Sequence, residues 1–203
     1  DVYKRQHIRY ILKGINNYES IQLNISLGNL LDSYSIPDKV KLACLTIDTS
    51  MRHLDAIGDN HLSKKAILIG DLLSAHFYTL LAEINDPTYQ LSMSKAIVKM
   101  NEIKSSLNQS NLSDDEIKDA IVNIEVLFPF ITISHFGKSL NKLHLFNELT
   151  STYQNYHPEY LENFSKDKIN QFLKEINQSY IKRRGNDLSL IHISEPTRRY
   201  AIS

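Results

Sequence analysis

The carboxylates with the most suggestive spacing in this sequence are Asp114, Asp115 and Asp119. Magnesium prefers carboxylate oxygens, so paired aspartates are one signature of a magnesium-diphosphate site. However, Ser113 and Glu116 have the spacing of a capping box that opens a helix. The two adjacent aspartates then occupy the first turn, where negative side chains stabilise the positive end of the helix dipole. The spacing therefore favours a structural role over a metal site.

The other candidate groups are one cysteine, eight histidines and a pair of arginines. Cys44 lies on an apolar stripe, where a small buried residue is expected, and nothing beside it indicates an activated thiolate. His53 and His76 fall inside predicted helices without the spacing of a metal-ligand pair. The cations Arg183 and Arg184 could bind a diphosphate. However, two arginines followed by a glycine, here Gly185, are also typical of a helix C-terminus. We expect structural roles for all of them and no metal site.

Motifs of most enzyme classes are absent: the serine nucleophile elbow, the glycine-rich phosphate loop, the dinucleotide fingerprint and the His-Glu-x-x-His zinc helix. The 23 basic residues balance 23 acidic ones, so no overall field attracts nucleic acid. A single cysteine excludes an intramolecular disulfide. No apolar run reaches the roughly 20 residues that span a bilayer, and no secretion signal is recognisable. The sequence predicts a cytoplasmic protein with no nucleic-acid partner and no transmembrane segment.

The elements that must position these groups are helices, because apolar residues recur at helical spacing throughout the chain. The clearest predicted helix, 37–57, has five apolar residues at steps of four and three: Val40, Cys44, Ile47, Met51 and Leu54. A second helix, 62–84, is apolar most of the way round, which is typical of a buried helix. Further helices are predicted over 7–18, 21–31, 93–107, 113–137 with a kink at Pro129 and a stop at Gly137, 140–156 and 169–184.

No window shows the alternation that is typical of strands. No linker rich in proline and serine divides the chain. We therefore expect an all-α protein, a single-domain bundle of about eight helices.

Both ends of the chain resemble translated sequencing-adaptor DNA. These are residues 1–6, DVYKRQ, and residues 188–203, LSLIHISEPTRRYAIS. Segments that do not belong to the natural protein must be excluded from reasoning about its fold. The alternative is that they are ordinary chain ends. We predict a helical domain over 7–187 and adaptor-derived, non-native ends.

The stretch 41–85 is similar to the central pair of helices of trans-polyprenyl diphosphate synthases. Its strongest part is ILIGDLL over 67–73, with Gly70 and Asp71 at its centre, followed by a run of aromatic and small residues. In that superfamily, a similar Gly-Asp segment follows the helix that carries the aspartate-rich catalytic motif. The resemblance implies an isoprenoid-synthase-like helical fold.

The wider stretch 20–184 resembles the small subunits, component 1, of bacterial heptaprenyl diphosphate synthases. Residues 47–49, Ile-Asp-Thr, fall where those subunits have Leu-Asp-Thr. The resemblance implies a heterodimer with a large catalytic subunit. That partner would condense isopentenyl diphosphate with an allylic diphosphate to make the side-chain precursor of menaquinone.

Catalytic members of the superfamily carry Asp-Asp-x-x-Asp, whose carboxylates hold the Mg²⁺ ions that neutralise the departing diphosphate. At that place this chain has DTSMR, in which Asp48 keeps only the first carboxylate and Arg52 replaces the last. The alternative placement, 54–59, also lacks the adjacent pair. The second aspartate-rich motif is missing as well. We expect no catalytic residue and no cofactor in this subunit, with Mg²⁺ held by the catalytic partner.

In this family the small subunit is held to help shape the tunnel that limits product length. Bulky residues after the Gly-Asp segment are candidates for the tunnel or the subunit interface: Phe77, Tyr78 and Leu81. Packing in the core is the competing role for all three.

Two further functions remain open from the sequence. One is a helical partner-binding protein unrelated to isoprenoids, and the other is a self-sufficient Mg²⁺-dependent prenyl or terpene synthase. The missing carboxylates weigh against the second.

Overall fold

A computed structural model describes residues 23–55, 62–107, 112–137, 140–151 and 158–193. Within these ranges the chain forms α-helices and one short 3₁₀ helix, and no strand. They are α2 (Ile25–Asp32), α3 (Asp38–Asp55), α4 (Leu62–Ile84), α5 (Pro87–Leu107), α6 (Asp114–Phe136), α7 (Lys142–Thr150), η2 (Glu159–Leu161) and α8 (Lys166–Ile193). The all-α prediction is confirmed, while the helix predicted over 7–18 lies outside the described residues.

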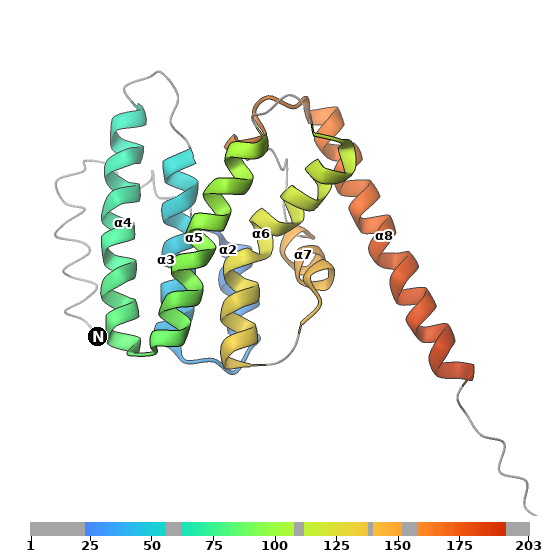
Figure 1. Cartoon of the computed structure of the whole chain (residues 1–203), viewed down its shortest axis with the longest axis horizontal. Helices are drawn as coiled ribbons and strands as arrows, with labels where there is room; N and C mark the ends of the chain where they lie inside the picture. The colour runs from blue at the N-terminus through green and yellow to red at the C-terminus, as the bar shows by residue number, and fades with distance from the viewer. Residues whose placement is uncertain (1–22, 56–61, 108–111, 138–139, 152–157, 194–203) are drawn as a thin grey trace, which may run out of the picture.

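Helix α4 lies at one edge of the molecule and α8 at the opposite edge (Figure 1). The most extensive helix contact is that of α3 with α4, followed by α5 with α6 and α6 with α7. Among the described elements, α4 therefore packs chiefly on α3. No described helix other than α3 makes an extensive contact with α4.

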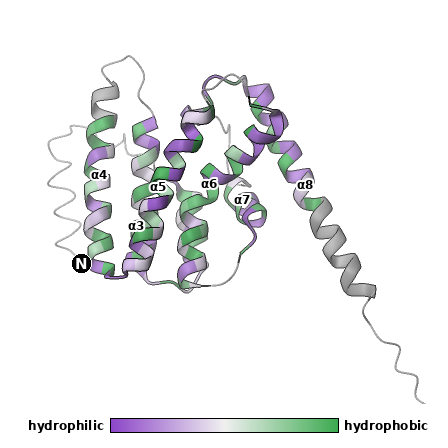
Figure 2. Cartoon of the chain, viewed as in Figure 1, coloured by the Kyte–Doolittle hydropathy of each residue, from purple (hydrophilic) through white to green (hydrophobic). Residues whose placement is uncertain are grey.

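The core is built by apolar side chains from all the described α-helices, α2 to α8. Its largest fully buried members include Phe77, Tyr89, Phe128, Phe146 and Phe172. Hydrophobic residues recur along each of these helices (Figure 2), as the helical period requires. Burial of one such side chain stabilises the fold by about 1.5–3 kcal/mol. One core therefore joins sequence positions about a hundred residues apart.

The break between α4 and α5 is a tight turn at Asn85 and Asp86. Asn85 adopts the left-handed conformation, with φ 55°, which asparagine tolerates better than most residues. The Oδ1 atom of Asp86 accepts a hydrogen bond from the backbone N–H of Tyr89 at 2.9 Å, and Pro87 occupies the first helical position. The predicted end of the helix 62–84 is confirmed.

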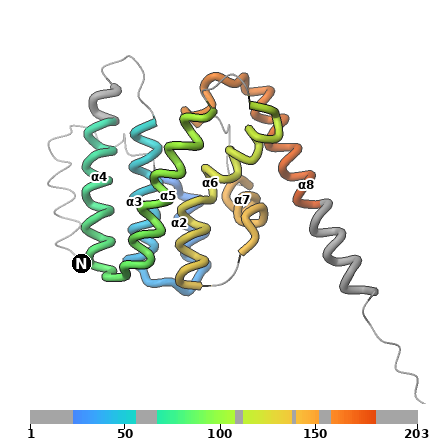
Figure 3. Tube along the Cα trace, in the orientation of Figure 1, coloured from blue at the N-terminus to red at the C-terminus, as the bar shows by residue number. Residues whose placement is uncertain are grey.

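Helix α6 begins with the predicted capping box. The backbone N–H of Ser113 donates to Oε2 of Glu116 at 2.8 Å, and the N–H of Glu116 donates to Oγ of Ser113 at 3.3 Å. Helix α6 bends along its length (Figure 3). It contains Pro129, which removes one backbone hydrogen bond and so causes a kink. Gly137 follows its last residue.

Several predicted helix ends are wrong. Helix α5 begins at Pro87 rather than at 93, and α7 ends at Thr150 rather than at 156. Local hydrogen bonds explain two further differences, the starts of α2 and α7. Helix α2 starts at Ile25 because Oδ1 of Asn24 accepts from the N–H of Leu27 at 3.0 Å. Helix α7 starts at Lys142 because the side chain of Asn141 accepts from the N–H of Leu143 at 2.8 Å. Both asparagines act as N-caps.

The end of α8 is also wrong, because this helix does not stop at Gly185 but continues to Ile193. A glycine inside a helix costs only about 1 kcal/mol relative to alanine, so it does not end a helix by itself. Helix α8 crosses the predicted domain boundary at residue 187. The adaptor origin of the ends stays a prediction.

Candidate functional site

Asp48 and Arg52 lie one turn apart on α3 and form an ion pair. The Nε atom of Arg52 donates to Oδ2 of Asp48 at 2.9 Å. Its Nη2 atom donates to Oε2 of Glu125 on α6 at 3.0 Å. The side chains of Asp48 and Glu125 are 9% and 0% exposed. One guanidinium thus bridges two buried carboxylates on different helices.

Two further polar residues complete this group. The hydroxyl of Tyr160, in η2, donates to Oε1 of Glu125 at 2.9 Å. The Nδ2 atom of Asn24, the N-cap of α2, donates to Oδ2 of Asp48 at 3.3 Å. We call Asn24, Asp48, Arg52, Glu125 and Tyr160 the Arg52 cluster. It ties together residues of α2, α3, α6 and η2.

A second ion pair adjoins the Arg52 cluster. The Nζ atom of Lys104, on α5, donates to Oδ2 of Asp55 near the end of α3 at 2.5 Å. Lys104 also lies over the ring of Tyr160, 6.0 Å from its centroid. Burial raises the pKa of Asp55, and the charges of Lys104 and Arg52 oppose this rise. Three carboxylates and two cations therefore share this end of the bundle.

The carboxylates present do not fit a magnesium-diphosphate site. Such a site needs several carboxylate oxygens facing a common point. Here the carboxylates of Asp48 and Glu125 both bind the guanidinium of Arg52, and a divalent ion about 4 Å from that guanidinium would be repelled by several kcal/mol. Within the described residues, no three His, Cys, Asp or Glu side chains gather as metal ligands would.

Sequence reasoning found Asp48 and Arg52 but missed Glu125 and Tyr160. Glu125 is the one charge in the apolar run IVNIEVLFPF, 121–130. A lone charge on the apolar face of a helix needs a buried partner. That signal marks Glu125 as a polar core residue, although it does not name Arg52.

Gly70 lies in the contact between α3 and α4. The Oγ atom of Ser50 donates to the carbonyl oxygen of Gly70 at 2.8 Å and lies 2.8 Å from Oγ of Ser74. A Cβ atom at Gly70 would lie 2.6 Å from Cγ of Leu54 and 3.3 Å from the carbonyl oxygen of Ser50. The contact leaves no space for any side chain. Asp71, the next residue, is exposed.

Two comparisons with known proteins identify relatives of this chain. Residues 2–131 match the family described as HexPS-like: hexaprenyl diphosphate synthase, small subunit. The chain is also 54% identical to a protein of known structure, described as the crystal structure of heptaprenyl diphosphate synthase from Staphylococcus aureus. That match has a TM-score of 0.75 and covers 91% of this chain and 98% of the other.

The chain belongs to the HexPS-like family of small subunits. The predicted resemblance is confirmed, and so is the isoprenoid-synthase-like fold. The alternative of a helical protein unrelated to isoprenoids is set aside.

In this HexPS-like subunit, the three residues predicted for the tunnel or interface differ in exposure. Phe77 and Leu81 are 0% and 1% exposed and belong to the core, whereas Tyr78 is 49% exposed. The rings of Phe77 and Tyr78 are 5.3 Å apart. Core packing accounts for the burial of Phe77 and Leu81. Of the three, only Tyr78 is exposed, and its role at an interface stays a prediction.

The other candidate residues with described side chains are buried or form ion pairs with lysines. Cys44 is buried, and burial raises the pKa of its thiol to about 12. His53 is buried, its Nε2 has no hydrogen-bond partner among the described residues, and burial lowers its pKa. Asp114 binds Lys168 at 2.6 Å, and Asp115 binds a lysine of its own helix. The side chains of Arg183 and Arg184 lie outside the described residues.

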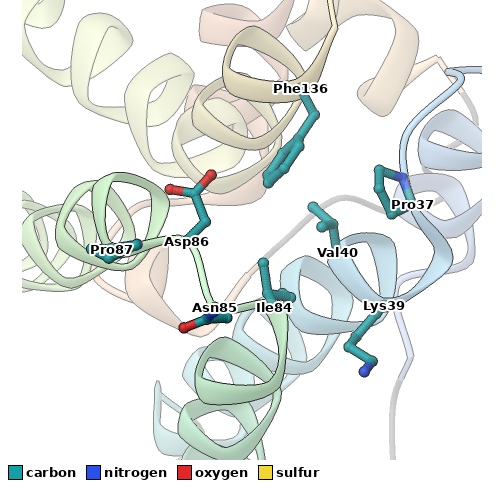
Figure 4. Close-up of a pocket in the computed structure, with 8 residues that line it drawn as sticks. All are labelled: Pro37, Lys39, Val40, Ile84, Asn85, Asp86, Pro87 and Phe136. Carbon is teal, nitrogen blue, oxygen red and sulfur yellow. The ribbon is translucent and has the colours of Figure 1, made fainter.

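The subunit also has an open pocket of about 430 Å³ at the other end of α3 (Figure 4). Its lining residues are Pro37, Lys39, Val40, Ile84, Asn85, Asp86, Pro87 and Phe136. The two charges in it are paired, Lys39 with Glu83 at 3.1 Å and Asp86 with His135 at 2.8 Å. Asp48 lies about 12 Å further along α3 than Val40, at 1.5 Å per residue. The pocket is therefore separate from the Arg52 cluster.

Proposed function

We propose that this chain is the non-catalytic subunit of a two-subunit polyprenyl diphosphate synthase. Its larger partner condenses isopentenyl diphosphate with an allylic diphosphate and thereby makes the prenyl side-chain precursor of menaquinone. The partner holds the Mg²⁺ ions, and both chains work in the cytoplasm. Membership of a small-subunit family supports the role of a companion chain.

The main support for a non-catalytic role is the ion-pair bridge from Asp48 through Arg52 to Glu125. Ionisation of an allylic diphosphate requires metal ions that neutralise the leaving group. In this chain a fixed guanidinium neutralises the buried carboxylates instead. Displacing Arg52 would leave two buried charges without compensation, and a broken buried ion pair costs about 3–5 kcal/mol. The cluster is therefore a structural tie between helices.

The remaining contribution of this subunit is to bind and complete its partner. A chain that binds only the folded form of its partner stabilises that form by mass action. Such a subunit raises activity without contributing a reacting group. We expect the activity of the pair to follow the amount of complex formed.

Three parallel assays test this function. The purified chain, the catalytic subunit and their mixture are each given Mg²⁺, an allylic diphosphate primer and radiolabelled isopentenyl diphosphate, and prenyl products are extracted and counted. We expect no product from this chain alone and elongation by the mixture. Robust elongation by this chain alone would overturn the proposal.

A catalytically dead partner serves as the control. When the first aspartate-rich motif of the catalytic subunit is changed to asparagines, the mixture should still form a complex and should lose elongation. Retained elongation would mean that this chain supplies reacting groups, which contradicts the proposal.

A further inference from the structure

The side of helix α3 that faces away from the core is buried. Its core side carries Cys44 and Met51, which are 0% and 6% exposed. Successive residues of an α-helix are turned by about 100°, so Thr46 and Thr49, each two residues from one of these, lie nearly opposite to them. His53 follows Thr49 by one turn. Thr46, Thr49 and His53 are nevertheless only 6%, 0% and 8% exposed, and we call them the outer side of α3.

The described neighbours of α3 lie on its other sides. Ser50 donates a hydrogen bond to Gly70 of α4, whereas Asp48 and Arg52 bind residues of α2 and α6. The arc of α3 from Arg52 round to Ser50 is about 160° wide, at 100° per residue, and it contains the whole outer side. The outer side makes no hydrogen bond or ion pair with another described element. Its burial therefore needs a part of the chain outside the described residues.

The outer side of α3 calls for an apolar cover. The Oγ1 atom of Thr46 donates to the carbonyl oxygen of Leu42 at 2.7 Å, and Oγ1 of Thr49 donates to that of Leu45 at 2.7 Å. Both hydroxyls are thus satisfied by their own helix, which leaves the methyl groups for contact. Leu42, one turn before Thr46, is 43% exposed and extends the apolar surface. A covering segment with an apolar face fits these groups.

Most segments outside the described residues are too short or too distant to cover this side. Residues 194–203 follow α8, at the opposite edge of the molecule from α4 and its neighbour α3 (Figure 1). The outer side extends over about 10 Å from Thr46 to His53, at 1.5 Å per residue. The internal segments have only two to six residues each: 56–61, 108–111, 138–139 and 152–157. This leaves residues 1–22, which precede α2.

The end of this N-terminal segment is held beside α3. The Nδ2 atom of Asn24 donates to Oδ2 of Asp48 at 3.3 Å, and Asp48 immediately precedes Thr49. The chain therefore enters its described part next to the outer side of α3. Residues 19–22 span up to about 13 Å when extended, which is enough to bring the preceding residues over that side.

The predicted helix 7–18 has the apolar face that such a cover needs. It is about 18 Å long at 1.5 Å per residue, which exceeds the length of the outer side. Arg9 and Lys13 lie on its polar face. The apolar residues occupy about a third of its circumference: Ile8, Ile11, Leu12, Ile15 and Tyr18. An isolated helix of this length is marginal in water, so its apolar face needs a surface on which to pack.

We propose that residues 7–18 form an amphipathic helix whose apolar face covers the outer side of α3. The three residues of that side are buried within a single chain, so neither a second copy nor another protein provides the cover. The helix encloses α3 on its last open side and leads directly into Asn24 of the Arg52 cluster. This packing lies within one chain and does not depend on the proposed catalytic partner.

The first test uses Thr49→Cys as a reporter in a chain whose own thiol is removed by Cys44→Ala. Ellman's reagent should label this reporter slowly, as local opening allows. Ile11→Ser together with Ile15→Ser removes two large apolar side chains from the proposed contact. We therefore expect this pair of substitutions to make labelling at least about tenfold faster.

The matched control places two serines on the polar face of the same segment. Arg9→Ser together with Lys13→Ser should leave the labelling rate of the reporter within about twofold, because these side chains face away from the contact. The native thiol of Cys44, on the core side of α3, shows whether the whole fold opens. In the chain without the reporter, Cys44 should stay slow with either pair of substitutions.

The second test detects the contact by a disulfide and removes no more than one apolar side chain of the segment at a time. A disulfide needs Cα atoms within about 7 Å of each other. Thr49→Cys, again with Cys44→Ala, is combined in turn with three substitutions on the apolar face: Ile8→Cys, Ile11→Cys and Ile15→Cys. We expect at least one of these pairs to close under mild oxidation, as measured by mass spectrometry. The controls on the polar face should not close: Arg9→Cys and Lys13→Cys.

Several results would overturn the proposed packing. Rapid labelling of Thr49→Cys above an unchanged segment would show an open surface, and labelling that Ile11→Ser with Ile15→Ser does not accelerate would assign the cover to another segment. Disulfides that close only from the polar face, or from neither face, would also contradict it. If the reporter and Cys44 accelerate equally, the whole fold has opened, and the disulfide result then decides.

Discussion

The Arg52 cluster buries charged side chains, and helix α4 exposes apolar side chains. Both arrangements are the opposite of what is usual in a folded protein. In the cluster, the carboxylates of Asp48 and Glu125 are 9% and 0% exposed. On α4, Leu68 and Tyr78 are 62% and 49% exposed. Buried charges need internal partners, and exposed apolar surface needs an external one. The buried charges of the first region are thus paired within this chain, whereas the apolar side chains of the second are exposed in the described part of the chain.

The two regions also differ in their described contacts. The Arg52 cluster holds α2, α3, α6 and η2 together. Helix α4 exposes apolar side chains, among them Leu68 and Tyr78.

The largest effect is expected from Arg52→Ala, which removes the cation of the Arg52 cluster. It leaves the carboxylates of Asp48 and Glu125 buried without it, so the free energy of unfolding should fall by about 3–5 kcal/mol. Urea denaturation followed by circular dichroism measures this. Lys99→Ala is the control, because Lys99 pairs with Glu102 at the surface with side chains 61% and 59% exposed. The Lys99→Ala control should change the free energy of unfolding by less than about 1 kcal/mol. Equal effects of the two variants would show that the Arg52 cluster stabilises the fold no more than a surface ion pair does.

Gly70→Ala tests the contact that joins the two regions. A Cβ atom there would overlap Leu54, and overpacking costs about 1–3 kcal/mol. The control is Gly28→Ala on α2, where nothing lies within 4 Å of the added carbon. Gly28→Ala should stabilise the fold by up to about 1 kcal/mol through helix propensity alone. The two urea midpoints should move in opposite directions, and a shift in the same direction would remove the steric explanation for Gly70.

The third prediction concerns pH and the buried His53 beside Arg52. Burial lowers its pKa, so the unfolded chain takes up a proton near pH 6.5 while the folded chain does not. Stability should therefore fall as pH drops below the ordinary histidine range, until the pH passes the lowered pKa of the folded state. His53→Leu should reduce this loss between pH 7.5 and 5.5, as measured by urea denaturation at each pH. An unchanged pH dependence in the variant would contradict the prediction.

The smallest effect is expected at Cys44, whose thiol has its pKa raised to about 12 by burial. At pH 8 only about one thiol in ten thousand would be ionised, and the thiolate is the reactive form. Ellman's reagent should therefore label the folded chain slowly, at the rate of local opening, and the urea-unfolded chain rapidly. Fast labelling of the folded chain would show that the core around α3 is not closed.

Much of the fold could be predicted because its signals are local. The capping box of α6 and the C-terminal end of α4 depend on residues a few positions apart, and the spacing of Ser113 and Glu116 was sufficient to place the first. The ends of α2 and α7 were missed because the side chains of Asn24 and Asn141 compete for backbone N–H groups. Spacing alone does not show which asparagine will cap.

The site was only half predictable, because its other half comes from distant parts of the chain. The replacement of a carboxylate by Arg52 was visible in the sequence, but its partner Glu125 lies 73 residues away. The exposure of Tyr78 next to the buried Phe77 was also not predictable. A helix that is apolar all round gives no period that identifies its inward face.

The central claim is that the carboxylates near Arg52 do not hold a metal-bound diphosphate. Titration of Mn²⁺ together with inorganic pyrophosphate into the isolated chain, followed by calorimetry, tests it most directly, with the catalytic subunit as the positive control. We expect no saturable binding to this chain and binding to the catalytic subunit. Saturable binding to this chain that is lost in Asp48→Asn would contradict the claim.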